Sequence, residues 1–172
     1  MEKKIRIYLI GFMGSGKTHW GKRMAQALQV PFFDLDEVIT VSSQKTITEI
    51  FSLHGEEYFR TLEKEALEAV TADHEQFIIS CGGGTPCFFN NIDFMKKQGR
   101  VWWLNTAVDV LVARLLKEKT KRPLLRTIAD EDMKAVIIKK LQERRFYYQQ
   151  ANVVVDEDLI NLDELLKLVT HA

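Results

Sequence analysis

The sequence has few cysteines and prolines, no excess of charge of either sign and no long apolar run. Its 172 residues include two cysteines and three prolines, and 24 lysine and arginine residues balance 24 aspartate and glutamate residues. Two cysteines are too few for a disulfide framework, and Cys81 and Cys87 flank a glycine run at a spacing that fits neither a redox pair nor a zinc site. We therefore expect both to be reduced thiols that pack.

The charge balance and the short apolar runs limit the partners that the protein can bind and its location in the cell. A balanced charge gives no overall positive field, so we expect no nucleic acid partner. The first apolar run, residues 5–10, is too short for a secretory signal or a membrane span. We expect a cytoplasmic protein without a membrane partner, and a monomer is the default expectation for its assembly.

Short runs of β-branched and aromatic residues alternate with longer segments of helical period. This alternation is typical of βαβ units, and nearly unbroken apolar runs suit buried parallel strands. With 172 residues and 46% hydrophobic content, the chain is long enough for one substantial core but short for two, so we expect one α/β domain over residues 1–172. The expected strands are residues 5–10, 31–33, 77–79, 101–104 and 153–155.

A glycine-rich motif follows the first expected strand and opens an expected helix at residues 17–28. Gly11-Phe12-Met13-Gly14-Ser15-Gly16-Lys17-Thr18 fits the P-loop pattern G-x-x-x-x-G-K-[ST]. The backbone N–H groups and the helix N-terminus would bind phosphate oxygens of ATP, Lys17 would bridge the β- and γ-phosphates, and Thr18 would offer its hydroxyl to Mg²⁺. A tight glycine turn without a ligand is the alternative.

Two carboxylates, Asp34 and Asp36, follow the second expected strand. Because parallel strands end at the same edge of a sheet, both carboxylates would lie close to the phosphates. One would serve Mg²⁺, and the other would accept the proton of an attacking hydroxyl. Either aspartate could instead cap the helix that follows.

An arginine on an apolar helix face indicates a second, anionic ligand. In the expected helix at residues 133–150, Ile137, Leu141, Arg144 and Tyr148 follow steps of four, three and four, so Arg144 projects from the apolar stripe. A guanidinium aimed inward needs an anion. The alternatives are that the side chain reaches out to solvent or pairs with a buried carboxylate.

Two other segments offer similar hints. Arg60 and Glu63 form an i, i+3 pair, for which an ordinary ion pair on the helix surface is the alternative. Gly82-Gly83-Gly84 follows the third expected strand. Three consecutive glycines carry a large entropy cost, which makes sense where a ligand must touch the backbone, although a flexible turn is also compatible.

The segment from Lys117 to Arg126 is dense in positive charge. Pro123 biases Arg122 away from helical geometry, so we expect an extended, mobile surface loop and not the end of the preceding helix. Like charges repel in the free segment and would gain most by closing on a polyanion, which would bring Arg122 onto the phosphates. A solvated charge run without a catalytic part is the alternative.

Taken in order, these blocks resemble the shikimate kinases from Ile5 to about Leu168. The resemblance implies a five-stranded parallel sheet in the order 2-3-1-4-5 flanked by helices, with a lid at about 117–127 and acceptor-binding helices at about 36–70. It also implies transfer of the γ-phosphoryl group of ATP to the 3-hydroxyl of shikimate, a step of aromatic amino acid biosynthesis, with Mg²⁺ as cofactor. It rests on the P-loop, Asp34-x-Asp36, Ile50-Phe51 with Gly55-Glu56-x-x-Phe59-Arg60-x-x-Glu63, Gly82-Gly83-Gly84, Arg122-Pro123-Leu124-Leu125, and Arg144 with Tyr148.

The same resemblance implies roles on the acceptor side. Asp36 would hold ring hydroxyls of shikimate, while Asp34 would belong to the magnesium side. Arg60 and Arg144 would bind the substrate carboxylate, because arginine matches a planar carboxylate better than lysine does. Glu63 would orient Arg60. Phe51 and Phe59 would wall the pocket, and Gly82, Gly83 and Gly84 would approach the ring.

On the nucleotide side, Lys17, Arg122 and Mg²⁺ would supply positive charge to the moving phosphoryl group. Arg114 is the candidate for the purine. Two departures from the family stand nearby: His19 replaces a small hydroxyl residue and is expected to be partly exposed without a role, and Asp156-Glu157-Asp158 is acidic where some relatives have an arginine beside adenine.

Two other functions remain open. Another small P-loop kinase, such as one for gluconate or a nucleotide, would share Lys17 and Thr18 but not the Arg60/Glu63 and triple-glycine blocks. A non-catalytic nucleotide switch would need the P-loop but no second pocket lined by arginine.

Overall fold

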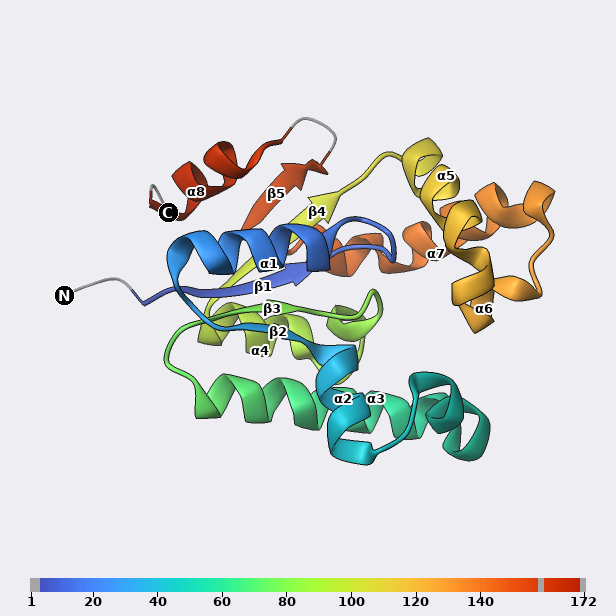
Figure 1. Ribbon diagram of the computed structural model, residues 1–172, viewed down its shortest axis with the longest axis horizontal. Helices are drawn as coiled ribbons and strands as arrows, with labels where there is room; N and C mark the ends of the chain where they lie inside the picture. The colour runs from blue at the N-terminus through green and yellow to red at the C-terminus, as the bar shows by residue number, and fades with distance from the viewer. Residues whose placement is uncertain (1–3, 158–159, 171–172) are drawn as a thin grey trace.

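The computed structural model describes residues 4–157 and 160–170, and a five-stranded sheet runs through their centre (Figure 1). The strand order is β2-β3-β1-β4-β5, and each neighbouring pair is parallel. The expected α/β fold and strand order are therefore confirmed. The strands are β1 Arg6–Ile10, β2 Phe32–Asp34, β3 Phe77–Ser80, β4 Arg100–Asn105 and β5 Val153–Asp156.

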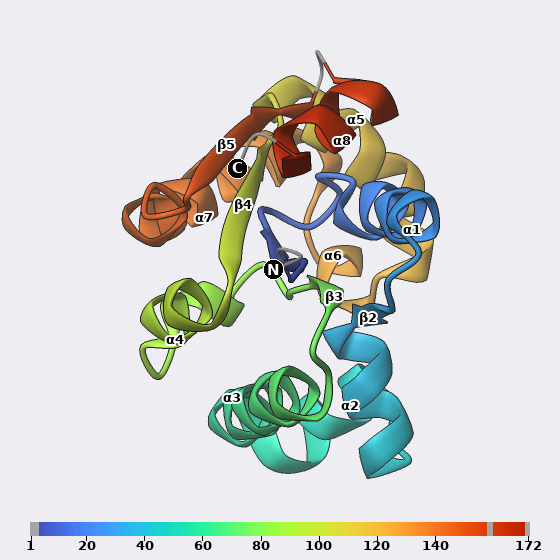
Figure 2. The ribbon, with the colours of Figure 1, turned by 90° about the vertical axis from the view of Figure 1, so that its left-hand side faces the viewer.

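Helices cover both faces of the sheet (Figure 2). One face packs against α1 and α8, and the other packs against α3, α4 and α7. Among the described residues, no helix is both long and apolar enough to cross a membrane. The helices are α1 Lys17–Leu28, α2 Leu35–Ser43, α3 Ile47–Asp73, α4 Asn91–Gln98, α5 Val108–Glu118, α6 Pro123–Arg126, α7 Met133–Tyr148 and α8 Leu162–Thr170.

Strand β1 explains why the expected strands read as nearly unbroken apolar runs. Successive side chains of a strand point to opposite faces, and here both faces are covered. Tyr8 and Ile10 belong to the core beneath α3 and α4, whereas Ile7 and Leu9 belong to the core beneath α1 and α8. The P-loop follows directly, at the carboxyl edge of the sheet.

Segment 117–127 differs from the expected extended loop. Helix α5 runs to Glu118, a 3-10 turn follows at Lys119–Lys121, and α6 occupies Pro123–Arg126. Only Arg122 between them has extended backbone, with φ −116° and ψ 100°. Proline disfavours helix at the residue before it but suits the first position of a new helix, so Pro123 both interrupts and restarts helical structure.

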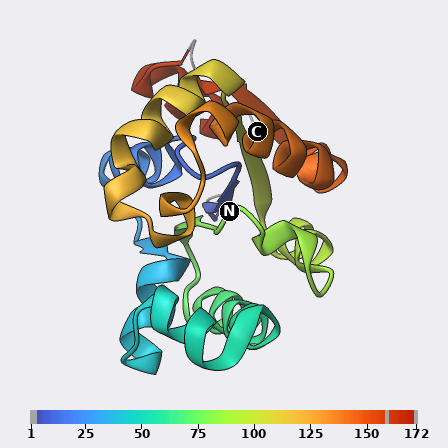
Figure 3. The same ribbon diagram turned by 90° about the vertical axis from the view of Figure 1, so that its right-hand side faces the viewer.

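A small apolar cluster anchors this segment next to the P-loop. Leu125 of α6 is buried together with Phe12 of the P-loop, Leu115 of α5 and Ile137 of α7. Figure 3 shows two units at the same end of the sheet. Segment 117–127 (gold) lies above this end, and α2 with the start of α3 (cyan to teal) lies below it. The chain therefore brings two peripheral helical units to the edge that carries the P-loop.

Candidate active site

A cleft of about 710 Å³ lies at the carboxyl edge of the sheet. It collects residues from the P-loop, from the ends of β2, β3 and β5, and from α5 and the residue before α6. Its lining residues are Met13, Gly14, Gly16, Lys17, Thr18, His19, Trp20, Asp34, Asp36, Ser80, Cys81, Gly82, Gly83, Arg114, Glu118, Arg122 and Glu157.

The P-loop curls around the Lys17 ammonium group. Lys17 Nζ donates to the carbonyl oxygens of Gly11 and Phe12 over 2.8 and 2.9 Å. Burial lowers the pKa of Lys17 to about 8, although Cys81, Asp34 and Asp36 act in the opposite direction. Positive φ values at Gly14 (80°) and Gly16 (91°) explain why glycine stands at these turns. Ser15 is buried within the loop.

Asp34 uses its two carboxylate oxygens for different partners. Oδ1 accepts the backbone N–H of Asp36 over 3.0 Å and caps α2, while Oδ2 accepts the Thr18 hydroxyl over 2.8 Å. Asp34 therefore both caps α2 and lies beside the P-loop. Ser80 at the end of β3 adds a third oxygen, 3.4 Å from Thr18 Oγ1. Sequence reasoning missed Ser80, although its position at a strand end is a usable signal.

Asp36 projects into the cleft near the glycine run. A Cβ atom on Gly82 would lie 3.9 Å from Asp36 Oδ1. The side chain is open to the cleft, but the walls remove part of the water around its carboxyl group. This desolvation, together with the negative charges of Asp34 and Glu63, raises the pKa of Asp36 to about 6.

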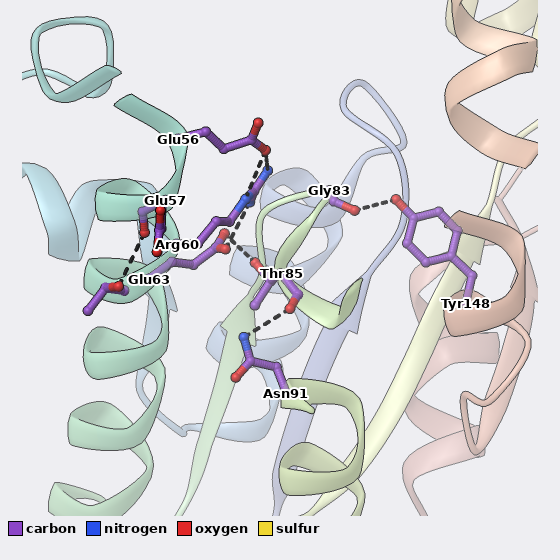
Figure 4. A network of polar contacts seen from close by, with 9 residues as sticks. Glu56, Glu57, Arg60, Glu63, Gly83, Thr85, Asn91 and Tyr148 are labelled. Atoms are coloured by element: carbon purple, nitrogen blue, oxygen red, sulfur yellow. Dashed lines mark hydrogen bonds and ion pairs between the residues drawn. The ribbon is translucent and has the colours of Figure 1, made fainter. Parts of the chain in front are cut away.

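Arg60 and Glu63 form a buried network and not a surface pair (Figure 4). Arg60 Nη1 donates to Glu63 Oε2 over 2.9 Å, and Glu63 is fully buried. Thr85 donates its hydroxyl to the other Glu63 oxygen over 2.5 Å. Arg60 also donates to Glu56 Oε1, from Nη2 over 3.1 Å. Thr85, which sequence reasoning missed, therefore fixes the glutamate that holds Arg60.

Side-chain ends of the site approach each of the three glycines closely. A Cβ atom would lie 2.6 Å from Glu63 Oε1 on Gly82, 2.8 Å from Arg144 Nη1 on Gly83 and 2.5 Å from Arg60 Nη2 on Gly84. The run contains no positive φ, so a larger residue here would meet the ends of these side chains and not a backbone restriction. Glu63, Arg144 and Arg60 make these close approaches, and contact between a ligand and this backbone stays a prediction.

Arg144 lies on the inner face of α7, as the helical stripe predicts. Ile137 and Tyr148 on the same stripe are buried, and Tyr148 donates its hydroxyl to the Gly83 carbonyl over 2.6 Å (Figure 4). The Arg144 guanidinium carbon lies 5.3 Å from the centre of the Phe12 ring. Its Nη1 atom is buried without a hydrogen-bond partner in the described part of the chain. Arg144 therefore presents an unsatisfied donor beside the glycine run.

Phe51 and Phe59, the aromatic residues expected to wall the acceptor pocket, lie beside Arg60. They are not among the residues that line the large cleft. The rings of Phe51 and Phe59 are 4.7 Å apart. The Arg60 guanidinium lies 5.2 Å from the Phe59 ring and 4.3 Å from the ring of Phe88. Arg60, Glu63, Arg144 and Gly84 are likewise outside the lining of the large cleft and border it through Gly82 and Gly83.

Arg114 and Glu157 close the opposite end of the cleft. Arg114 Nη1 donates to the Gly14 carbonyl over 3.0 Å and lies 3.0 Å from Glu157 Oε2. Glu157 is buried, whereas Asp156 before it is exposed. Of the acidic stretch Asp156-Glu157-Asp158, Asp158 lies outside the described residues. Sequence reasoning treated this stretch only as a departure and missed Glu157 as part of the site.

Arg122 lines the cleft from segment 117–127. Its Nε and Nη2 atoms contact Glu118 Oε2 over 2.8 and 2.7 Å. His19 also lines the cleft and is exposed, as expected. Both cysteines are free, with Cys81 buried and Cys87 half-buried. The structure thus brings together a P-loop lysine, two aspartates and four arginines in or beside the cleft at one edge of the sheet.

Comparisons with known proteins give a consistent result. The family model for shikimate kinase matches residues 13–171. A curated shikimate kinase from Bacteroides thetaiotaomicron is 43% identical over 154 residues, which cover 90% of this chain and 87% of the relative. A crystal structure of shikimate kinase from the same organism has a TM-score of 0.88 at 40% identity, and covers 97% of this chain and 95% of that one.

A second solved structure extends the likeness to a protein with a bound ligand. The shikimate kinase from Acinetobacter baumannii, solved in complex with shikimate, has a TM-score of 0.87 at 30% identity. That match covers 99% of this chain and 95% of the other. Neither a gluconate kinase nor a nucleotide switch is favoured by these findings. The fold, the P-loop cleft and the similarity over most of its length show that this chain belongs to the shikimate kinase family of ATP-dependent kinases.

Proposed function

We propose that this protein transfers the γ-phosphoryl group of ATP to the 3-hydroxyl of shikimate, giving ADP and shikimate 3-phosphate. The acceptor follows from the family and from the relative that binds shikimate. The nucleotide follows from the P-loop at the strand-to-helix junction of β1 and α1.

The observation that carries the proposal is that the glycine run lies close to both the P-loop and Arg144. A Cβ atom on Gly83 would lie 2.8 Å from Arg144 Nη1 and 3.5 Å from the carbonyl oxygen of Gly11 in the P-loop. One short segment therefore borders both the phosphate-binding loop and an arginine with an unsatisfied donor. A small acceptor with one carboxylate and several hydroxyls would lie between them, with Asp36 in the lining of the same cleft as an acceptor for hydroxyl protons.

The chemical work is mainly positioning and charge neutralisation. Lys17 would contact the β- and γ-phosphates, and Arg122 would leave Glu118 to reach the moving phosphoryl group. Asp36 would orient the acceptor hydroxyl and receive its proton, for which a pKa of about 6 is suitable near neutral pH. Arg60 and Arg144 would bind the carboxylate of the acceptor, with Glu63 holding Arg60 in place.

We also propose Mg²⁺ as the cofactor. The Thr18 hydroxyl and the Asp34 carboxylate are hard oxygen ligands that already lie 2.8 Å apart. In the described part of the chain no cluster of three or more His, Cys, Asp or Glu residues could hold a metal. This suits Mg²⁺, which is usually held by one or two protein oxygens, water and substrate phosphates. When bound, the ion would neutralise phosphate charge.

The proposal extends to the state of the protein in the cell. We propose a cytoplasmic monomer folded as one domain over residues 1–172, without a nucleic acid or membrane partner. The balanced charge of 24 basic and 24 acidic residues supports the absence of a nucleic acid partner. Light scattering on the purified protein tests the monomer.

An ADP-release assay with a panel of acceptors tests the function. We expect turnover with shikimate and Mg²⁺, and at least a hundredfold less with gluconate or a nucleoside monophosphate. Lys17→Met provides the background rate, because it removes the cation that contacts the phosphates while leaving the loop glycines. Turnover that prefers gluconate or a nucleotide would overturn the proposal.

A further inference from the structure

A second pocket, of about 510 Å³, lies at the amino edge of the sheet, opposite the P-loop. Its lining comes from the starts of β1 and β4 and from the last residues of α1, α4 and α8. Figure 1 shows the end of α8 on the side of the sheet that faces away from α5 and α6. The apolar wall of the pocket is formed by Ile5, Ile7, Leu28 and Val169. A volume of this size is typical of sites for small molecules.

Two side chains of β4 bring hydrogen-bond donors to this pocket. Arg100 and Trp102 are two residues apart on the strand, so they point to the same face of the sheet, which is the face that α1 and α8 cover. Trp102 is fully buried. Its indole Nε1 and the Nη1 atom of Arg100 are buried, and neither has a hydrogen-bond partner among residues 4–157 and 160–170. A buried donor without an acceptor is destabilising, so an acceptor from a ligand would stabilise both groups.

The charge of the lining is positive. Besides Arg100, the lining contains Lys4, Arg6 and Lys97, and none of the described residues in it is acidic. Arg6 donates to backbone carbonyl groups, and Lys4 is paired with an exposed carboxylate. Lys97 and Arg100 form no ion pair with any residue that the structure describes. The pocket therefore has two unpaired cations beside an apolar wall.

The helix ends offer another explanation for these cations. Helices α1, α4 and α8 all end at the pocket, and the C-terminus of a helix carries a partial negative charge. Lys97 and Arg100 would offset that charge. This explanation leaves the two donors unpaired, because no carbonyl group in the described part of the chain accepts a hydrogen bond from Nη1 of Arg100 or from Nε1 of Trp102.

We propose that this pocket binds a small amphipathic carboxylate. The aromatic or aliphatic body of the ligand lies against the apolar wall, and its carboxylate accepts hydrogen bonds from Arg100 and Trp102. A carboxylate fits because it is an acceptor without donors, carries the opposite charge and matches the planar guanidinium group. No described residue lines both this pocket and the P-loop cleft, so the ligand can bind while both substrates are in place. The site is independent of the proposed function.

Calorimetry with hydrocinnamate as the probe tests the proposal. The titration is done on the protein alone and again with saturating ADP and shikimate. We expect one molecule to bind to this site with the same affinity in both titrations. Hydrocinnamyl alcohol and phenylpropylamine have the same body with a neutral or a cationic head, and they should bind at least about tenfold more weakly. No binding of hydrocinnamate, or equal affinity for the alcohol or the amine, would overturn the proposal.

Variants show where the probe binds. Arg100→Gln should weaken hydrocinnamate binding at least about tenfold, and Trp102→Phe, which keeps a ring but removes the N–H group, about threefold. Lys97 and Lys96 are adjacent lysines of α4, of which only Lys97 lines the pocket. Lys97→Gln should weaken binding about threefold, and Lys96→Gln should leave it unchanged. If Arg100→Gln, confirmed folded by circular dichroism, binds hydrocinnamate as tightly as the wild-type protein, the proposal is wrong.

Two outcomes would identify a different occupant or a different site. If shikimate displaces all of the bound hydrocinnamate, the probe occupies the acceptor pocket and the proposal is overturned. Removal of residues 171–172, which follow the lining residue Thr170, should leave the affinity unchanged. If hydrocinnamate binds only after this removal, the end of the chain and not a small molecule is the occupant, which also overturns the proposal.

Discussion

Arg60 and Glu63, which lie one helical turn apart on α3, form a buried ion pair. Nη1 of the arginine lies 2.9 Å from Oε2 of the glutamate. The pair looks in the sequence like many exposed i, i+3 pairs, but its position under the glycine run removes it from water. A buried charge that loses its partner is strongly destabilising, whereas removal of both charges costs far less.

The stability of two variants should reflect this burial. Among the described residues, Arg60→Met leaves the Glu63 charge with Thr85 alone as a close donor, so the free energy of unfolding should fall by about 3–5 kcal/mol. Adding Glu63→Gln removes the buried charge and should restore at least half of that loss. Urea unfolding of the two variants measures both values. Equal stabilities of the single and the double variant would contradict a buried pair. Neither variant should regain shikimate binding.

Arg144 offers a cleaner test of acceptor binding than Arg60. In the described part of the chain no carboxylate forms an ion pair with Arg144, so its removal leaves no acidic residue unpaired. Arg144→Ala should weaken shikimate binding by about 2 kcal/mol, roughly thirtyfold, and leave ATP affinity nearly unchanged.

Calorimetry with each ligand separately measures these affinities. Arg145→Ala is the matched control, because Arg145 is the exposed neighbour on the same helix. Equal losses for shikimate and ATP, or the same loss in the control, would show general damage and not an acceptor contact.

The pH dependence of catalysis should report Asp36. Its pKa is raised from 3.8 to about 6, and in the proposed reaction the ionised form would accept the proton. Below pH 6 the protonated fraction grows, so kcat/KM for shikimate should fall about tenfold per pH unit, and it should level off above pH 7. Steady-state rates between pH 4.5 and 8 measure the profile. Asp36→Asn should lower the rate by orders of magnitude and remove the bend; a bend that persists in this variant belongs to another group.

Arg122 should be essential for turnover although it is bound to Glu118 in the structure. Arg122→Ala should lower kcat at least about a hundredfold, as expected for a lost arginine that stabilises phosphoryl transfer. Arg126→Ala is the control: this exposed arginine donates to the Thr120 carbonyl in the same segment and should keep turnover within about threefold.

Amide exchange adds a second measurement on the same segment. Exchange across residues 117–127 should slow when ADP and shikimate are added together, if the segment closes on both substrates. A solvated charge run without a catalytic part would give turnover within about twofold for Arg122→Ala and no change in exchange.

The sequence predicts several residues of the site because each of them belongs to a specific local pattern. The P-loop residues, the aspartates after β2 and the stripe that carries Arg144 follow from motif, strand end and helical period. All of them lie at the carboxyl edge of the sheet or border it. The strand order came from the resemblance, because local patterns do not determine which strands pair.

Other features depend on contacts between distant segments and leave little local signal. Thr85 binds Glu63 across 22 residues, and Trp20 binds Glu157 across 137 residues. The glycine run suggests a close approach, but nothing in it shows that the approaching groups are Arg60 and Arg144. Pro123 correctly indicates extended backbone at Arg122, yet the helical turns on both sides depend on the burial of Leu125 against Phe12 and α5.

Identification of the product tests the central claim most directly. The protein should be incubated with ATP, Mg²⁺ and shikimate, with Lys17→Met as the background, and the product examined by ³¹P NMR. We predict one new phosphomonoester signal coupled to the proton on carbon 3 of the shikimate ring, formed with one ADP per product. Release of inorganic phosphate without an ester, or an ester on another hydroxyl, would contradict the account.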